Sequence, residues 1–266
     1  MTSSVPVVPI LAEIEAHQRR ARLSFRLQSA GVWVGLAGAL VFSLWVMGKI
    51  HPDFIGTWGP FILGGTWITV LVSASSILIA TVLAVLGAIG RLSRNPLISG
   101  FAGLYVSLVR GTPLLVQIFF FFFVLPEFGV VLPAIPTGIV ALSFNYGAYM
   151  TEIFRAGIQA VPIGQREAAE SLGMPERLVM RRIVLPQAFR IVIPAIGNDF
   201  VAMIKDSALL STIGVQELLW RAHTVGTRHF RTLETLLIAA AIYWVLTIVF
   251  SFFQERLERR MARGDR

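Results

Sequence analysis

The sequence contains no cysteine, so it can form neither a disulfide nor a thiolate metal site. Lysine is nearly absent as well, since Lys49 and Lys205 are the only two among 23 basic residues. A P-loop holds nucleotide phosphates with a glycine-rich run that ends in Lys followed by Ser or Thr. Ile50 and Asp206 follow the two lysines instead. The chain therefore lacks a Walker A motif, and ATP hydrolysis by this chain is excluded.

Charge is also scarce. Charged residues make up 14% of the chain, whereas 55% are hydrophobic and the mean hydropathy is +0.73. A soluble domain of 266 residues would need more charge to cover its surface. The composition predicts one polytopic, all-α domain that has the lipid bilayer as its solvent. In such a chain the net charge of +8 reflects orientation in the membrane, and no nucleic-acid partner is expected.

Catalytic and metal-binding residues are missing from the pattern. The four histidines lie in predicted tails and outer loops without metal-ligand spacing, at His17, His51, His223 and His229. No nucleophile–base pair or cofactor loop stands out. We expect no catalytic residue, metal or cofactor in this chain.

Long apolar runs predict six membrane-spanning helices, because about 20 apolar residues cross the hydrocarbon core. The runs cover residues 27–48, 54–90, 95–126, 128–151, 191–215 and 235–254. The second exceeds one span, so its start is expected to be an outer loop or a surface helix. The first is too long for a cleaved signal peptide and no small-residue cleavage site closes it, which favours an uncleaved anchor.

The distribution of basic residues predicts the orientation. Seventeen of the 23 fall in segments 1–28, 90–96, 155–190 and 255–266, which alternate with the outer segments. Because basic residues accumulate in cytoplasmic loops, both termini are expected in the cytoplasm. The predicted layout is a cytoplasmic tail at 1–28, an additional transmembrane helix at 29–48, a transmembrane domain at 60–255 and a cytoplasmic tail at 256–266.

A polar island, QREAAESLGMPERLVMRRIVLP at residues 165–186, interrupts the apolar runs on the predicted cytoplasmic side. Its first part favours a helix that Gly173 can cap, and Pro175 suits the start of a second helix. The pattern predicts two short helices across the membrane surface. From these facts alone, an ordinary amphipathic loop helix is an equal alternative. A DNA-binding helix-turn-helix is excluded because membrane spans hold both of its ends.

The island resembles the EAA signature of ABC importer membrane subunits, E-A-A-x3-G-x9-I-x-L-P. Its full spacing is present as Glu167-Ala168-Ala169, Gly173 and Ile183-Val184-Leu185-Pro186. Residues 60–260 are similar to the polar amino-acid uptake permeases, notably in RGTPLLVQIFFF at 110–121, GAYMTEIFRAG at 147–157, IGQREAA at 163–169 and PQAFR at 186–190. The chain departs from that family by Lys-Asp-Ser-Ala-Leu at 205–209, where Lys-Asp-Thr-Ser-Leu is more usual, and by its first span.

This resemblance implies a type I ABC importer-like transmembrane domain, with a five-helix core plus one N-terminal helix and a coupling-helix hairpin at 163–186. In such importers the hairpin docks in a cleft of a cytoplasmic ATPase, which binds ATP and Mg²⁺. Glu167 and Gly173 would transmit ATPase closure, Ala168 and Ala169 would permit close docking, and Arg177 would lie at the rim.

The same resemblance implies the partners and the location. The expected partners are two ATPase subunits, a second permease that is identical or related, and an extracytoplasmic substrate-binding protein. The expected location is the bacterial inner (plasma) membrane, where this multi-pass subunit would form half of the translocation path for a polar amino acid.

Charges inside the predicted spans are costly and so mark functional sites. Asp199 and Asp206 are seven residues apart and project from one face of a helix. Pro194, Gly197 and Asn198 are expected to loosen that helix beside a cavity. Two carboxylates there suit a cationic group, such as the α-ammonium group of an amino acid or a basic side chain.

Neighbouring polar residues complete the predicted substrate site. Ser207 and Thr112 are expected to donate to a substrate carboxylate, Arg110 to supply positive charge, and Lys205 is counted in the same predicted substrate site. The alternative is that Arg110, Lys205 and Asp206 neutralise one another as structural residues.

Two further interpretations stay open from the sequence. The chain could be an ion-coupled secondary transporter that uses Asp199 or Asp206 as the proton or cation site. Separately, Glu217 with Arg221 beyond the fifth span could form an outer gate or a receptor contact.

Overall fold

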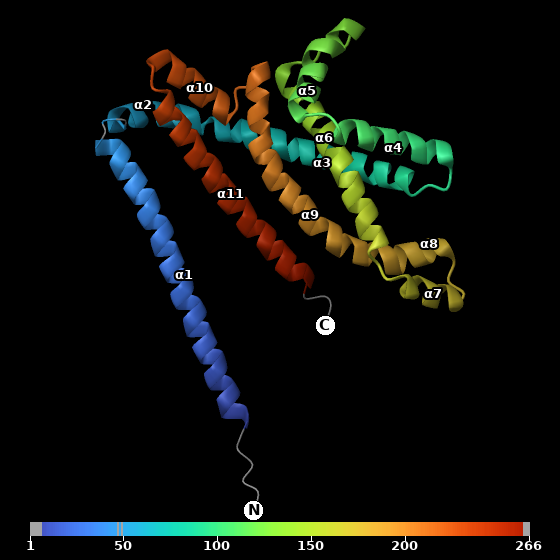
Figure 1. Ribbon diagram of the computed structural model, residues 1–266. Helices are drawn as coiled ribbons and strands as arrows, with labels where there is room; N and C mark the ends of the chain where they lie inside the picture. Colours follow the sequence, from blue (N-terminus) through green and yellow to red (C-terminus); the bar gives the residue numbers. More distant parts are fainter. Residues whose placement is uncertain (1–6, 47, 49, 263–266) are drawn as a thin grey trace, which may run out of the picture. The chain divides into compact units, whose positions relative to one another are not determined.

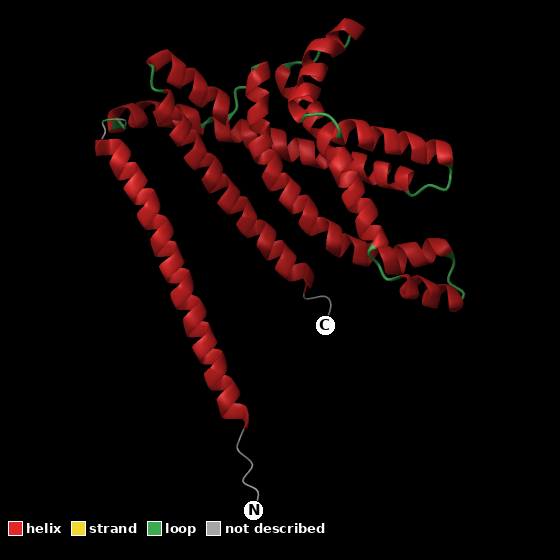
Figure 2. Ribbon diagram, viewed as in Figure 1, coloured by secondary structure: helices red, strands yellow, loops and turns green. Residues whose placement is uncertain are grey.

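The computed structural model describes residues 7–46, 48 and 50–262, and these residues form helices and no strand (Figure 2). This confirms the all-α class. The chain divides into two compact units, Met1–Ile55 and Gly56–Arg266. The first contains α1 (Val7–Val46), and α2 (Pro52–Leu63) crosses the boundary. Of the additional transmembrane helix predicted at 29–48, residues 29–46 lie within α1, and the span itself stays a prediction.

The second unit contains the elements that build the site (Figure 1). They are α3 (Gly65–Arg91), α4 (Pro96–Arg110), α5 (Leu114–Phe119), α6 (Ala134–Gln159), α7 (Ile163–Ser171), α8 (Glu176–Val179), α9 (Leu185–Asp206), α10 (Leu218–His229) and α11 (Thr232–Ala262). Short π-helical segments follow α5 and α8, at Phe120–Val124 and Met180–Val184.

Length and composition alone identify fewer spans than the six predicted. Among the described residues, Pro52–Arg91 and Thr232–Met261 qualify, and a third qualifies if Pro96–Arg110 and Leu114–Phe128 are one broken span. The helices α6 and α9, of 26 and 22 residues, are long enough for a hydrocarbon core of about 30 Å. Polar side chains within them lower their hydropathy, so composition does not single them out.

The apolar run at 95–126, predicted as one span, does not form one continuous helix. The chain bends by 106° between α4 and the segment that begins at Leu114. Gly111 caps α4 and Pro113 precedes α5 in an extended conformation. Proline has no N–H to continue a helical ladder, and its ring disfavours helical geometry in the residue before it. The sequence Arg-Gly-Thr-Pro therefore ends one helix and begins another.

The predicted loosening of the helix around Asp199 is also wrong. The helix α9 runs without interruption from Leu185 to Asp206, with Pro194 inside it. The change in geometry comes later, where Ser207–Ile213 form a 3-10 helix that ends at Gly214 with φ +84°.

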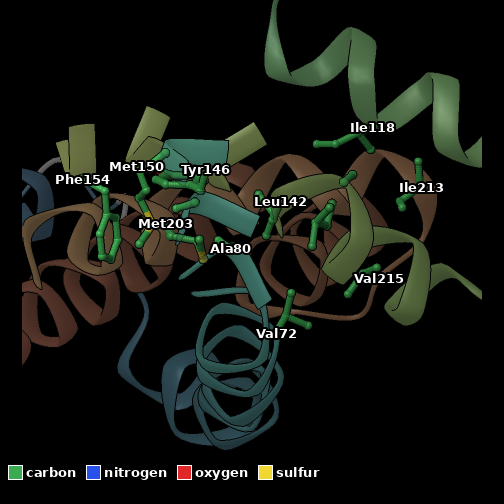
Figure 3. Packing of buried hydrophobic residues seen from close by; sticks show 14 of the residues in the cluster. Val72, Ala80, Ile118, Leu142, Tyr146, Met150, Phe154, Met203, Ile213 and Val215 are labelled. Carbon is green, nitrogen blue, oxygen red and sulfur yellow. The ribbon is translucent and has the colours of Figure 1, made fainter. Parts of the chain in front are cut away.

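The core is formed mainly by α3, α6 and α9, whose buried apolar side chains meet in Figure 3. Small residues bring α3, α4 and α6 close together. A methyl group added at Gly147 would lie 2.8 Å from the Tyr105 hydroxyl and 2.9 Å from Leu83 Cβ. The Tyr105 hydroxyl in turn donates to the Phe144 carbonyl at 2.7 Å. The close approach of these helices depends on glycine at this point.

We predict that Gly147→Ala destabilises the protein by about 1–3 kcal/mol, the usual cost of overpacking a filled interior. The measurement is the thermal unfolding of purified protein in detergent. Gly100→Ala is the matched control, because a methyl group there would meet nothing within 4 Å. Equal unfolding temperatures for the two variants would contradict the packing described.

Candidate functional site

A cavity of about 500 Å³ lies between the α4–α5 bend, α6 and α9. It is lined by Arg110, Gly111, Thr112, Pro113, Leu114, Asn145, Tyr146, Tyr149, Asp199, Ala202 and Asp206. Four of the six residues predicted to bind substrate therefore gather around one space, and they come from helices far apart in the sequence.

The two carboxylates of α9 differ in their surroundings. Asp206 Oδ2 accepts a hydrogen bond of 2.7 Å from the Tyr146 hydroxyl. Asp199 Oδ2 is buried and has no hydrogen-bond partner among the described residues. A buried carboxylate oxygen without a donor is costly. A hydrogen-bond donor or cation placed next to Asp199 would therefore be bound favourably.

Arg110 faces the cavity without neutralising these acids. Its guanidinium lies 5.2 Å from the centre of the Tyr149 ring, a cation–π contact. None of the ion pairs in the described part of the chain joins it to Asp199 or Asp206. Within one subunit, the alternative of mutual neutralisation by Arg110, Lys205 and Asp206 finds no support.

The remaining predicted residues have other surroundings. Lys205 is exposed and Ser207 is fully buried, and neither lines the cavity. The Ser207 hydroxyl donates to the Ile204 carbonyl at 2.8 Å, and the Thr112 hydroxyl donates to the Leu108 carbonyl at 3.0 Å. Both hydroxyls predicted to serve a substrate carboxylate already donate within the chain.

Sequence reasoning missed the side chain that holds the bend. Gln117 is buried, and its amide nitrogen lies 2.8 Å from the Val109 carbonyl oxygen. The same nitrogen lies 3.1 Å and 2.9 Å from the carbonyl and hydroxyl oxygens of Thr112. The Gln117 carbonyl accepts from the Asn145 amide at 3.1 Å, which fixes the bend to α6. In the sequence, Gln117 is marked only as a single amide within the apolar run Leu114–Leu125.

The contribution of α6 was missed too. Asn145, Tyr146 and Tyr149 line the cavity from this helix. The sequence Phe-Asn-Tyr-Gly-Ala-Tyr could have indicated them as a polar cluster. Tyr149 lies about one helical turn after Asn145 and Tyr146, so the three share one face.

The polar island forms the predicted hairpin. After α7, Gly173 adopts a left-handed conformation with φ +78°, which a glycine adopts without strain. The N–H of Gly173 donates to the Glu170 carbonyl and that of Met174 to the Ala169 carbonyl, at 2.9 and 3.1 Å. The second helix then continues through Met180–Val184 into α9, in which Pro186 occupies the first turn. Residues 163–186 thus contain two short helices joined at Gly173, the second of which runs into α9.

The EAA residues divide between the interior and the surface of the hairpin. Ala169 is buried against Val161, Val179 and Val184, whereas Glu167, Ala168, Gly173 and Arg177 are exposed. Ala168 and Ala169 therefore do not form one docking face. The outer surface also presents two apolar side chains, Ile163 and Leu172, which are 72% and 84% exposed.

Charged side chains join α3 and α7 to α6. The Glu152 carboxylate lies 3.2 Å from the Arg91 guanidinium and 2.6 Å from that of Arg155. The Arg166 guanidinium donates to the Ile158 carbonyl at 2.9 Å. These contacts join α3, α6 and α7 at one end of the molecule, away from α10 (Figure 1).

The proposed outer role of Glu217 is wrong, because its side chain is 1% exposed. Its carboxylate caps α10 by accepting from the N–H groups of Leu219 and Trp220 at 2.9 and 2.6 Å. It also accepts from the Tyr243 hydroxyl at 2.6 Å. A carboxylate engaged on all sides joins α10 to α11 and is not free to act as a gate.

Comparison with known proteins gives a consistent result. Residues 76–263 match the sequence model of the family described as binding-protein-dependent transport system inner membrane component. The L-cystine transport system permease protein TcyB of Bacillus subtilis is 40% identical over 205 residues, covering 77% of this chain and 88% of TcyB. The arginine transport system permease protein ArtQ of the same organism is 37% identical over 207 residues, covering 77% of this chain and 94% of ArtQ.

A solved structure agrees with these relatives. The crystal structure of an amino acid ABC transporter with histidines matches 79% of this chain and 100% of its own, with a TM-score of 0.75 and 38% identity. This match confirms the predicted ABC importer-like transmembrane fold, although the number of spans read from length and composition is smaller.

We predict that Gln117→Leu lowers stability by about 1–3 kcal/mol, because it removes the amide that donates to the carbonyl oxygens of Val109 and Thr112 and that accepts from the buried Asn145 amide. It should also reduce transport, since the bend places Arg110 at the cavity. The measurements are thermal unfolding and uptake by reconstituted protein. Gln216→Leu, at an exposed glutamine, is the control. If the Gln117 variant unfolded and transported like the wild type, the amide would not be what stabilises the bend.

Proposed function

Because the chain belongs to the family of binding-protein-dependent transport system inner membrane components, we propose that its cavity takes the transported amino acid while its hairpin receives the ATPase. The chain is a permease subunit of an ABC importer for amino acids. It is not an enzyme, and ATP is hydrolysed on a separate subunit. A secondary transporter that uses Asp199 or Asp206 as an ion site is not favoured.

The chemistry of the cavity favours a basic amino acid. An α-ammonium group needs one carboxylate, and the cavity offers two, at Asp199 and Asp206. Arg110 offers the charge that an α-carboxylate needs. The observation that carries this proposal is the buried, unpartnered oxygen of Asp199, which a second cationic group of the substrate would satisfy. A volume of about 500 Å³ lies within the range of small-molecule sites.

Each lining group then has a role. Asp206, held by Tyr146, binds the α-ammonium group, and Asp199 binds the cationic end of arginine, lysine, ornithine or histidine. Arg110, held over Tyr149, binds the α-carboxylate. Thr112 and Ser207 act indirectly, because their hydroxyls stabilise the backbone next to Arg110 and Asp206.

The hairpin is positioned to control this cavity. It runs through Met180–Val184 directly into α9, the helix that carries both aspartates. A helix is a stiff connection, so displacement of the hairpin by ATPase closure would move Asp199 and Asp206 with it. Glu167, Ala168, Gly173 and Arg177 lie on the exposed side and form the proposed ATPase contact, while Ala169 supports them from within.

The exposed position of Lys205 supports a second permease subunit. An unpaired lysine on a spanning helix is costly against lipid. Lys205 lies on α9 outside the cavity. It takes part in no ion pair within the described part of the chain. A water-filled path between two permeases, identical or related, would accommodate it. Two ATPase subunits bearing ATP and Mg²⁺ and an extracytoplasmic binding protein complete the proposed importer.

The orientation is part of the proposal. The family is an inner membrane component, and the arginines of the hairpin and of the end of α11 lie in segments that the distribution of basic residues assigns to the inside. Both termini would then be in the cytoplasm of a bacterial cell.

For coupling, we predict that Glu167→Lys or Gly173→Asp lowers transport by about tenfold or more, the size expected when a wrong charge enters an interface. The change should uncouple the ATPase without preventing membrane insertion. Receptor-stimulated ATP hydrolysis and uptake in proteoliposomes measure it. Glu255→Lys, an exposed charge reversal on α11, is the control. Wild-type transport by both hairpin variants would overturn the coupling role.

For the substrate, we predict that Asp199→Asn and Asp206→Asn weaken transport of basic amino acids by about ten- to a hundredfold, as expected for a lost charged hydrogen bond. Uptake of arginine and of a neutral amino acid, each with its binding protein, separates the two carboxylates. Only Asp206→Asn should also impair the neutral substrate. Glu127→Gln, at an exposed carboxylate, is the control. Normal arginine uptake by both variants would contradict the proposed site.

A further inference from the structure

A second cavity, of about 570 Å³, lies at the hairpin end of the molecule, apart from the proposed substrate site. Eleven of its twelve lining residues are apolar. Its floor is buried and includes Ala88, Phe154 and Ala188, whereas its rim includes Ile89 and Phe189, which are 64% and 46% exposed. It is therefore a groove that opens sideways between α3 and the beginning of α9.

One end of the groove is polar. Ser93 is the hydroxyl-bearing residue of the lining, and Arg94 follows it. The Arg94 guanidinium lies 3.7 Å from the Glu176 carboxylate of α8, and the two side chains are 94% and 78% exposed. A surface pair of this kind contributes little, so Arg94 can exchange its partner for a stronger anion. Guanidinium matches phosphate particularly well.

We propose that this groove binds one acyl chain of an anionic phospholipid, whose phosphate pairs with Arg94. The apolar lining excludes a polar solute, and the exposed apolar side chains at the rim suit a lipid environment. In the proposed orientation the polar end lies at the cytoplasmic surface, where anionic lipids attract basic residues. An apolar chain attached to a negative head matches both the groove and its end.

The site contacts the hairpin directly. Met180 and Leu185 line the groove on either side of the junction between the hairpin and α9. A phosphate at Arg94 replaces Glu176, which belongs to the second helix of the hairpin. Anionic lipid thus changes the contacts of the hairpin on the membrane side, while the ATPase acts on the opposite surface of the hairpin.

The first test uses the complete importer in nanodiscs of phosphatidylcholine with increasing phosphatidylglycerol, and measures receptor-stimulated ATP hydrolysis. Arg94→Ala should raise the amount of phosphatidylglycerol needed for half of its effect about fivefold, which corresponds to about 1 kcal/mol for one basic residue near an anionic surface. Arg94→Lys should retain most of the response. Arg259→Ala, at another exposed and paired arginine, should leave the response unchanged.

The second test does not depend on transport or ATP hydrolysis, and it exploits the absence of native cysteine. A photoactivatable probe on Ile89→Cys should cross-link phosphatidylglycerol in preference to phosphatidylcholine. The same probe on Phe101→Cys, which is 74% exposed on α4, should show no preference. Cross-linking of Ile89→Cys to a protein subunit, equal labelling of both lipids, or an unaltered lipid response in Arg94→Ala would overturn the proposal.

Discussion

The site depends on a bend in a membrane-embedded chain and on the buried amide that stabilises it. A helix that turns through 106° releases backbone carbonyls, which lipid cannot satisfy. Gln117 reaches back across the bend to the carbonyls of Val109 and Thr112, and its own carbonyl accepts from Asn145 on α6. One side chain thus satisfies the bend and ties it to the core. The cavity lies in the angle that results, with Arg110 at its edge.

The helix α9 connects the hairpin to the cavity. Asp199 and Asp206 line the cavity from the C-terminal part of α9, and the hairpin runs into the N-terminal end of the same helix. The close packing of Gly157 against Val192 holds that beginning to α6, and the charge cluster around Glu152 joins α6 to α3. The hairpin and the side chains of the proposed site are thus connected by one continuous helix. No separate relay of loops is required.

The sequence predicted what depends on local spacing. Seven residues separate Asp199 from Asp206, so they reach one cavity, and Gly173 takes the left-handed turn that its position demands. It did not predict what depends on tertiary partners. Hydropathy records how apolar a run is, but not which way the chain travels, so the bend after Arg110 was missed. Pro194 was expected to loosen α9, yet the helix is continuous through it. Glu217 looked available because its tertiary partner, the Tyr243 hydroxyl, could not be read along the chain. Ser207 is a different case, since its hydroxyl donates to the Ile204 carbonyl only three residues earlier.

Leu172 and Ile163 have a consequence for the life of the subunit in the cell. Both are largely exposed at the surface where the ATPase is proposed to dock. A permease made in excess would display this apolar edge, and exposed apolar edges favour aggregation and attract chaperones and proteases. Balanced synthesis of the subunits would protect the permease, and an orphan copy would be marked for removal by the same residues that recruit its partner.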